Sequence, residues 1–139
     1  MASPGAQRDN VRALHRVRVV VATRDRRFLR ASTFLLQRSG LDVYATHRVD
    51  DVPLLVERHE PHVVIFDASE SLASAARMLA AIETLYPGVS LLLVSDEPPA
   101  APATSLRVLP KWRTVERLVN EVELAYVQGR RRNGSDSSL

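Results

Sequence analysis

The sequence predicts an α/β fold, a doubly wound, five-stranded parallel sheet with helices on both faces. Two observations lead to this prediction. Short, β-branched apolar runs of the length of one buried strand alternate with longer segments whose apolar residues recur at the spacing of a helix. The connections between these segments are short, which is typical of βαβ units with right-handed crossovers.

Each element is justified by its own pattern. The apolar runs expected to be strands are residues 17–22, 42–46, 63–67, 89–95 and 106–109. The segments with helical spacing are residues 25–39, 52–59, 72–85 and 115–126. Asp25 suits the N-cap of the first helix, Gly40 ends that helix and Pro61 ends the second. Three closely spaced prolines between residues 98 and 102 predict a loop there, so that a fourth helix is missing or rudimentary.

Length and composition favour one soluble domain. The chain has 139 residues, of which 45% are apolar and 25% charged, so it can bury a core. The lack of cysteine excludes disulfides, thiolate metal sites and cysteine nucleophiles. No apolar run approaches the roughly 18 residues of a membrane span, so we expect no membrane partner and a cytoplasmic protein.

The basic charge lies at the two ends of the chain. Residues 1–16 and 129–139 each carry two net positive charges, so subtracting four from the total of +3 leaves −1 for residues 17–128. We expect a flexible N-terminal tail at 1–16, a folded domain at 17–128 and a flexible basic tail at 129–139. A nearly neutral domain does not favour nucleic-acid binding, which therefore depends on the tails alone.

Polar side chains follow the predicted strands. Asp67 ends the third strand, Ser95 ends the fourth and Lys111, the only lysine, follows the fifth. The carboxyl ends of parallel strands meet at one edge of a sheet, which is where ligands bind in such folds. We therefore expect Lys111 to pair with Asp67, and Arg24, after the first strand, to compete for the same carboxylate.

The domain resembles the receiver domain of two-component response regulators. The resemblance covers most of residues 17–128 and is clearest in 49–67, a helix, a proline and a strand that ends in aspartate. It implies the flavodoxin-like strand order 2-1-3-4-5 and a phosphoacceptor role for Asp67. It also implies that Ser95 and Lys111 contact the phosphoryl group, through a hydroxyl and a compact cation.

The sequence departs from the family at the metal site. The acidic pair that holds magnesium in the family matches Thr23 and Arg24, and Asp25 lies one residue too late. Asp25 and Asp67 remain weak candidates for metal ligands, and an arginine beside them opposes Mg²⁺. We therefore expect no cofactor and, at most, weak Mg²⁺ binding.

These features predict an atypical, stand-alone pseudo-receiver that acts through contacts with a histidine kinase or another signalling protein and is not an enzyme. Asp67 phosphorylation is expected to be impaired or absent. Two alternatives stay open, namely a functional phosphoacceptor that takes a phosphoryl group from a histidine kinase, and a nucleic-acid-associated protein that uses its basic tails. We expect a monomer or a weak homodimer, built from a face such as the first helix with Phe28 and Phe34.

Overall fold

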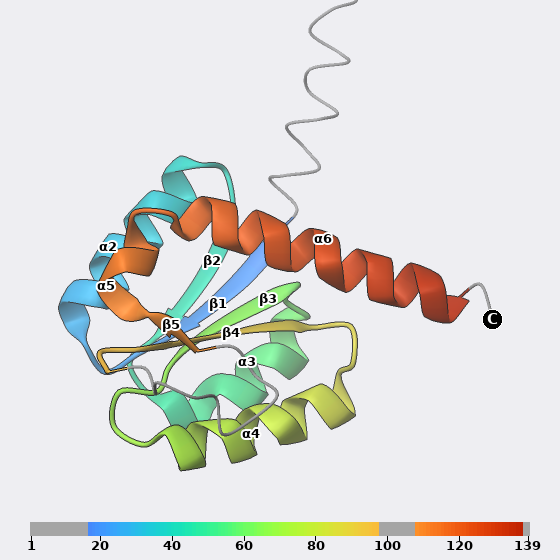
Figure 1. Ribbon diagram of the computed structural model, residues 1–139, viewed down its shortest axis with the longest axis horizontal. Helices are drawn as coiled ribbons and strands as arrows, with labels where there is room; N and C mark the ends of the chain where they lie inside the picture. The colour runs from blue at the N-terminus through green and yellow to red at the C-terminus, as the bar shows by residue number, and fades with distance from the viewer. Residues whose placement is uncertain (1–16, 98–107, 138–139) are drawn as a thin grey trace, which may run out of the picture.

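Five parallel strands form the middle layer of the protein, and helices cover both faces (Figure 1). The computed structural model describes residues 17–97 and 108–137. The strands are β1 (Arg18–Ala22), β2 (Asp42–Thr46), β3 (Val63–Asp67), β4 (Ser90–Ser95) and β5 (Val108–Pro110). The helices are α2 (Arg26–Arg38), the 3₁₀ turn η1 (Val49–Asp51), α3 (Val52–His59), α4 (Leu72–Leu85), α5 (Lys111–Val115) and α6 (Leu118–Ser137). The strand order, β2-β1-β3-β4-β5, confirms the predicted order.

The sheet separates two apolar cores. Side chains alternate along a strand, so Val19 and Val21 face α2, α5 and α6, whereas Val20 faces α3 and α4 (Figure 1). Val64 joins Val20, and all four valines are fully buried. Burial on both faces explains why the central strands are continuous apolar runs rather than alternating ones.

The carboxyl ends of the strands meet at one edge of the sheet, as predicted. Thr23 follows β1, Asp67 and Ser95 end β3 and β4, and Lys111 follows β5. The backbone N–H of Thr23 donates to the carbonyl of Thr46 at 3.1 Å, which holds the loop after β1 against the end of β2. This edge therefore carries the side chains that the sequence singled out.

The ends of α2 follow the sequence signals. The Asp25 carboxylate accepts hydrogen bonds from the backbone N–H groups of Arg27 and Phe28, so Asp25 is the N-cap as predicted. Gly40 has a φ of 88°, a left-handed conformation that glycine adopts without steric cost and that turns the chain into β2. The helix is thereby fixed at both ends.

The last helical segment differs from the prediction. It begins at Lys111, directly after Pro110, and is interrupted between α5 and α6. α6 then continues past residue 128 to Ser137 and extends beyond the sheet (Figure 1). The part of a helix that projects beyond the sheet packs on no core and needs no apolar stripe, so hydrophobic periodicity could not detect it.

Two of the predicted segments, the N-terminal tail and the proline-rich loop, fall wholly or mostly outside the residues that the structure describes. Residues 1–16, the expected tail, and residues 98–107, which contain most of the expected loop in place of a fourth helix, lie outside the described ranges. Within residues 17–97 and 108–137, no helix combines the length and apolarity that crossing a membrane requires.

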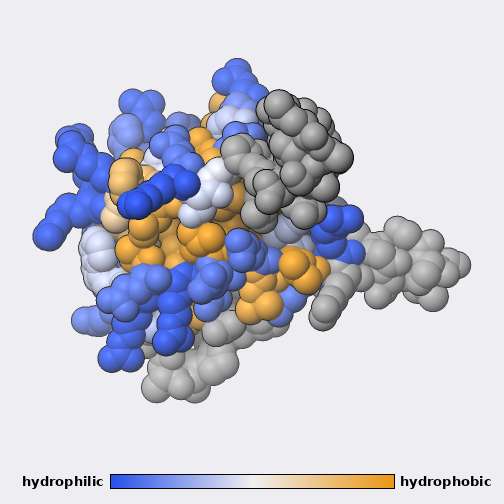
Figure 2. Space-filling view, turned by 90° about the horizontal axis from the view of Figure 1, so that it is seen from above, coloured by the Kyte–Doolittle hydropathy of each residue, from blue (hydrophilic) through white to orange (hydrophobic). Residues whose placement is uncertain are grey.

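An apolar area lies on the face formed by α2, α5 and α6, surrounded by hydrophilic side chains (Figure 2). Leu35, Val115 and Val119 line a groove of about 250 Å³ there. Phe34 on α2 is 59% exposed, but Phe28 is fully buried. Phe28 faces the core beneath α2 and therefore cannot take part in a dimer contact. This corrects the expected dimer face for Phe28, whereas Phe34 is accessible.

Replacing a core leucine of α4 is expected to destabilise the protein. Leu79 is fully buried and Leu85, in the same helix, is 72% exposed. Leu79→Ala should lower the free energy of unfolding by about 2–5 kcal/mol, because it removes buried methyl groups and leaves a cavity. The control Leu85→Ala should change it by about 0.5 kcal/mol or less. Urea denaturation measures both, and equal effects would contradict the packing described.

Candidate functional site

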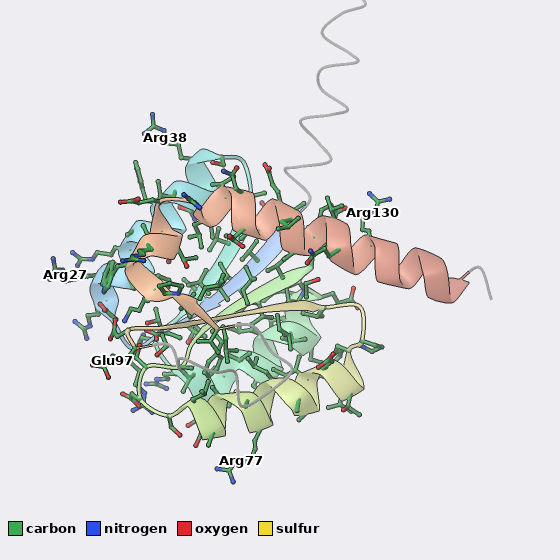
Figure 3. All side chains as sticks on the ribbon, viewed as in Figure 1. Arg27, Arg38, Arg77, Glu97 and Arg130 are labelled. Carbon is green, nitrogen blue, oxygen red and sulfur yellow. The ribbon has the colours of Figure 1, made fainter. Side chains whose placement is uncertain are left out.

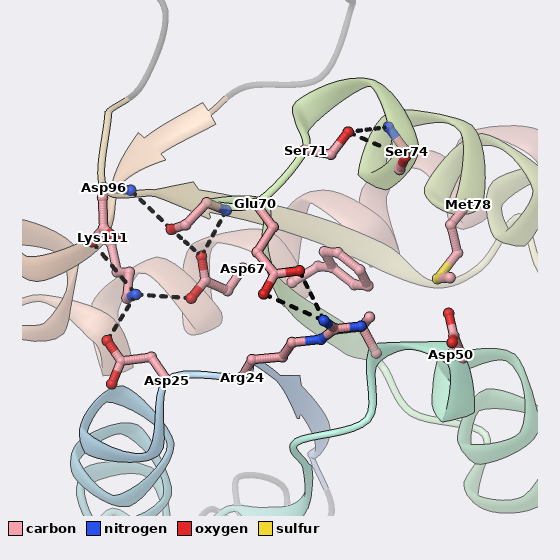
Figure 4. A pocket seen from close by; sticks show the side chains of 13 residues that line it. Arg24, Asp25, Asp50, Asp67, Glu70, Ser71, Ser74, Met78, Asp96 and Lys111 are labelled. Carbon is pink, nitrogen blue, oxygen red and sulfur yellow. Dashed lines mark hydrogen bonds and ion pairs between the residues drawn. The ribbon is translucent and has the colours of Figure 1, made fainter.

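The ammonium group of Lys111 lies among three carboxylates at the carboxyl edge of the sheet (Figure 4). Its Nζ atom is 2.9 Å from Oδ2 of Asp67, 2.9 Å from Oδ2 of Asp25 and 3.4 Å from Oδ1 of Asp96. The lysine side chain is only 2% exposed, so these carboxylates replace most of its hydration. The predicted pairing of Lys111 with Asp67 is confirmed, and the other two carboxylates were not foreseen.

Asp67 has no spare acceptor position. Its Oδ2 accepts hydrogen bonds from the Thr23 hydroxyl at 2.7 Å and from Lys111. Its Oδ1 accepts from both the backbone N–H and the hydroxyl of Ser69. An ionised carboxylate offers about four acceptor positions, so these four donors satisfy it. Its side chain is 5% exposed.

The contacts of Ser69, Asp25 and Asp96 with this network were not predicted from the sequence. Ser69 donates to Asp67 and also accepts a hydrogen bond from the backbone N–H of Asp96 at 3.1 Å, which links β3 to the end of β4. Asp25 was expected as an N-cap and as a weak candidate for a metal ligand, yet its second oxygen binds Lys111. A serine two residues after an aspartate is a common turn signal, and it could have indicated the Ser69 contact.

Arg24 does not compete for Asp67, which corrects the prediction. Its guanidinium forms an ion pair with Glu70 at 3.0 Å, and both side chains are more than half exposed (Figure 4). Thr23 takes the inward place instead, since its hydroxyl donates to Asp67, whereas Arg24 lies in the bend that follows β1. The arginine therefore closes one side of the site at its surface.

The Ser95 hydroxyl is used locally. It is buried and accepts a hydrogen bond from the backbone N–H of Glu97 at 3.2 Å. This is the turn role that serine commonly plays at the end of a strand. The predicted contact of Ser95 with a phosphoryl group stays a prediction, and the hydroxyl would have to leave the turn to make it.

Aromatic rings complete the surroundings of Lys111. Its Nζ lies 5.6 Å from the ring centre of Phe28 and 5.5 Å from that of Trp112, within the range of a cation–π interaction. The two rings meet edge to face at 5.8 Å. Trp112 therefore packs beside the lysine, although 46% of it is exposed.

The charges of the network stabilise one another. Burial by itself raises the pKa of Asp67, but hydrogen bonds from Ser69, Thr23 and Lys111 outweigh it and hold that pKa below its ordinary value. The pKa of Asp25 is lowered in the same way, with burial opposed by Lys111 and by the N-terminal amides of α2. For Lys111, burial lowers the pKa, but Asp67 and Asp25 raise it more. Asp67, Asp25 and Lys111 are thus all charged at neutral pH.

A cavity of about 520 Å³ opens beside this network, lined by both cations, Arg24 and Lys111, and by several carboxylates. The receiver-like sequence raises the question of Mg²⁺, which prefers near-octahedral oxygen ligands at about 2.0–2.1 Å. Within residues 17–97 and 108–137, no group of three or more His, Cys, Asp or Glu residues could hold a metal ion. Mg²⁺ would also have to displace Lys111 from Asp67, so these residues do not fit it.

Removing the central cation is expected to destabilise the fold. Lys111→Met leaves the buried Asp67 carboxylate without its counter-ion, so the free energy of unfolding should fall by about 3–5 kcal/mol. Arg113, on the same helix, is exposed, and Arg113→Met should cost about 0.5 kcal/mol or less. Urea denaturation at neutral pH compares the two variants. Similar losses in both would show that Lys111 is not the central cation.

The stability of the protein should fall toward both acid and alkaline pH. The folded-state pKa values of Asp67 and Asp25 are lowered, so their contribution is full above the ordinary aspartate value and is lost as pH falls through the lowered values. The pKa of Lys111 is raised, so its contribution is full below the ordinary lysine value and is lost as pH rises through the raised one. In Asp67→Asn the acid slope of the unfolding free energy against pH should be shallower. Urea titrations across pH measure this, and an unchanged slope would refute the assignment.

No protein-family model and no curated protein sequence matches the chain. Solved structures do match it. The signal receiver domain of a protein described as a LuxO repressor, from Vibrio parahaemolyticus, has a TM-score of 0.72 and 16% identity, and the alignment covers 84% of this chain and 95% of that one.

Two further structures agree with this result. The receiver domain of an HD domain-containing protein from Pseudomonas fluorescens Pf-5 has a TM-score of 0.66 and 19% identity, with 86% of this chain and 98% of that one covered. An orphan response regulator of H. pylori has a TM-score of 0.66 and 17% identity, with 79% and 96% covered. The chain therefore has the fold of a response-regulator receiver domain.

Proposed function

We propose that this protein is an atypical receiver-like signalling module that acts through contacts with another protein and not through phosphorylation of Asp67. It catalyses no reaction in this proposal. The observation that carries the proposal is the saturation of the Asp67 carboxylate by Thr23, Ser69 and Lys111.

Phosphorylation of an aspartate requires attack by a carboxylate oxygen on the phosphorus atom. The attacking oxygen needs a free electron pair and room for the donor, and both oxygens of Asp67 already accept two hydrogen bonds each. Attack would therefore have to break at least one contact of a side chain that is 5% exposed. This supports an unmodified Asp67 under ordinary conditions.

The same network supports independence from a metal ion. Phosphoryl transfer normally relies on divalent cations that neutralise the developing charge. Here the ammonium group of Lys111, which is fixed to the chain, pairs with the carboxylates of Asp67 and Asp25 and offsets part of their charge. A module built in this way keeps one charge state at its sheet edge and presents a constant surface to its partner.

A phosphodonor experiment tests the proposal. The protein is incubated with acetyl phosphate and Mg²⁺, and its intact mass is measured, with Asp67→Asn treated in parallel. We expect no mass increase, because Asp67 has neither a free oxygen nor a metal site. A receiver domain that does accept phosphate from the same donor serves as the positive control.

The opposite result would support the alternative of a functional phosphoacceptor. That result is a stoichiometric gain of one phosphoryl group in the wild type and none in Asp67→Asn. The third interpretation, nucleic-acid binding through the basic tails, stays a prediction, because residues 1–16 lie outside the described ranges.

A further inference from the structure

Next to the Lys111 network, exposed arginines surround a second cavity. This cavity has a volume of about 560 Å³. Four of its lining residues, Arg24, Arg26, His47 and Arg48, are called the arginine surface. The other lining residues are Val49, Asp50 and Asp51. The loop after β1 and the loop after β2 bring these residues together, since the N–H of Thr23 donates to the carbonyl of Thr46. The cavity shares Arg24 with the one beside Asp67.

The local backbone fixes the position of the arginine surface. The hydroxyl of Thr46 accepts a hydrogen bond from the N–H of Arg48 at 3.0 Å and donates to its carbonyl at 3.2 Å, so the turn that presents His47 and Arg48 is closed. On the other side, the Asp25 N-cap holds the start of α2, where Arg26 lies. The arginine surface thus stands on two segments with defined backbone hydrogen bonds, the turn after β2 and the start of α2.

The placement of these cations costs stability. Arg26 and Arg27 occupy the first turn of α2, which has no acidic residue, and the positive end of the helix dipole repels cations there. Neither Arg26 nor Arg48 forms an ion pair with any described residue. Exposed guanidinium groups that form no ion pair with a described residue are suited to bind carboxylates or phosphates from outside.

We propose that the arginine surface binds an acidic segment of a partner protein. Asp50 and Asp51 line the same cavity, and residues 17–128 carry a net charge of −1. A nucleic-acid backbone, with its uniform negative charge, would meet these carboxylates along with the arginines. A short protein segment with a few Asp or Glu residues needs only the local cations, and its other side chains can avoid Asp50 and Asp51.

This inference deepens the proposed function, because a module that acts through contacts needs a defined partner surface. The two stand on different residues, however. Phosphorylation of Asp67 would contradict the proposed function and leave the arginine surface untouched, whereas failure of the arginine variants would contradict this inference alone.

Fluorescence anisotropy of the full chain with a fluorescein-labelled oligoglutamate peptide, at physiological ionic strength, tests the inference. The variant Arg26→Glu/Arg48→Glu reverses two charges of the arginine surface. The control Arg38→Glu/Arg77→Glu reverses two exposed arginines elsewhere: Arg38 lies at the end of α2 far from Arg27, and Arg77 lies on α4 (Figure 3). Net charge and both tails are the same in the two variants, so only position differs.

We expect the wild type to bind, the control to bind within a small factor of the wild type, and Arg26→Glu/Arg48→Glu to bind roughly tenfold more weakly. The neutral variant Arg26→Gln/Arg48→Gln should show an intermediate loss. Arg26→Glu alone should raise the melting temperature, because it places an acid in the first turn of α2. Weaker binding without loss of stability would show that the surface, not the fold, is affected.

Other outcomes overturn the inference. They are no binding by the wild type, equal weakening by the control variant, or no weakening by Arg26→Glu/Arg48→Glu. A labelled single-stranded DNA oligonucleotide is measured in parallel. If the arginine variant loses affinity for DNA as much as or more than for oligoglutamate, the choice of an acidic protein segment is wrong.

Discussion

The ammonium group of Lys111 is the point on which the carboxyl edge of the sheet depends. It binds Asp25 from the start of α2, Asp67 from β3 and Asp96 from the end of β4, so one side chain joins three segments that are distant in sequence. Burying charges costs hydration, and the cost is offset only when the partners are well placed. Here Thr23 and Ser69 supply the remaining hydrogen bonds of Asp67, which makes the network internally complete.

This completeness is the feature on which the proposal of an unmodified Asp67 rests. A carboxylate that waits for a ligand keeps acceptor positions free, whereas the acceptor positions of Asp67 are occupied by groups of the same chain. Arg24, which pairs with Glu70, belongs to the arginine surface and also lines the cavity beside Asp67, so the two cavities adjoin at this residue. The edge of the sheet thus holds three carboxylates that share one buried ammonium group, beside a surface where Arg26 and Arg48 form no ion pair with a described residue.

The predicted positions of Asp67 and Lys111 were reliable because they depend on topology. Parallel strands end at the same edge, so residues that close the third and fifth strands come near each other whatever their side chains do. The prediction for Arg24 was wrong because it depended on the direction in which a loop side chain points. The turn after β1 points Thr23 inward and Arg24 outward, and spacing along the chain does not reveal which residue of a loop faces the site.

The order of apolar and polar residues predicted three features: the alternation of strands and helices, the burial of the strands, and the polar residues at the strand ends. It could do so because hydrophobic periodicity is a local property of the sequence that is present before the chain folds. The extension of α6, the hydrogen bonds of Ser69 and the second role of Asp25 followed only from packing. Each depends on contacts between segments that lie far apart in sequence or on a helix without an apolar stripe. The bond from the Asp96 N–H to Ser69 and the pairing of Asp25 with Lys111 join residues distant in sequence, so the geometry of the folded chain selects them and no local pattern encodes them.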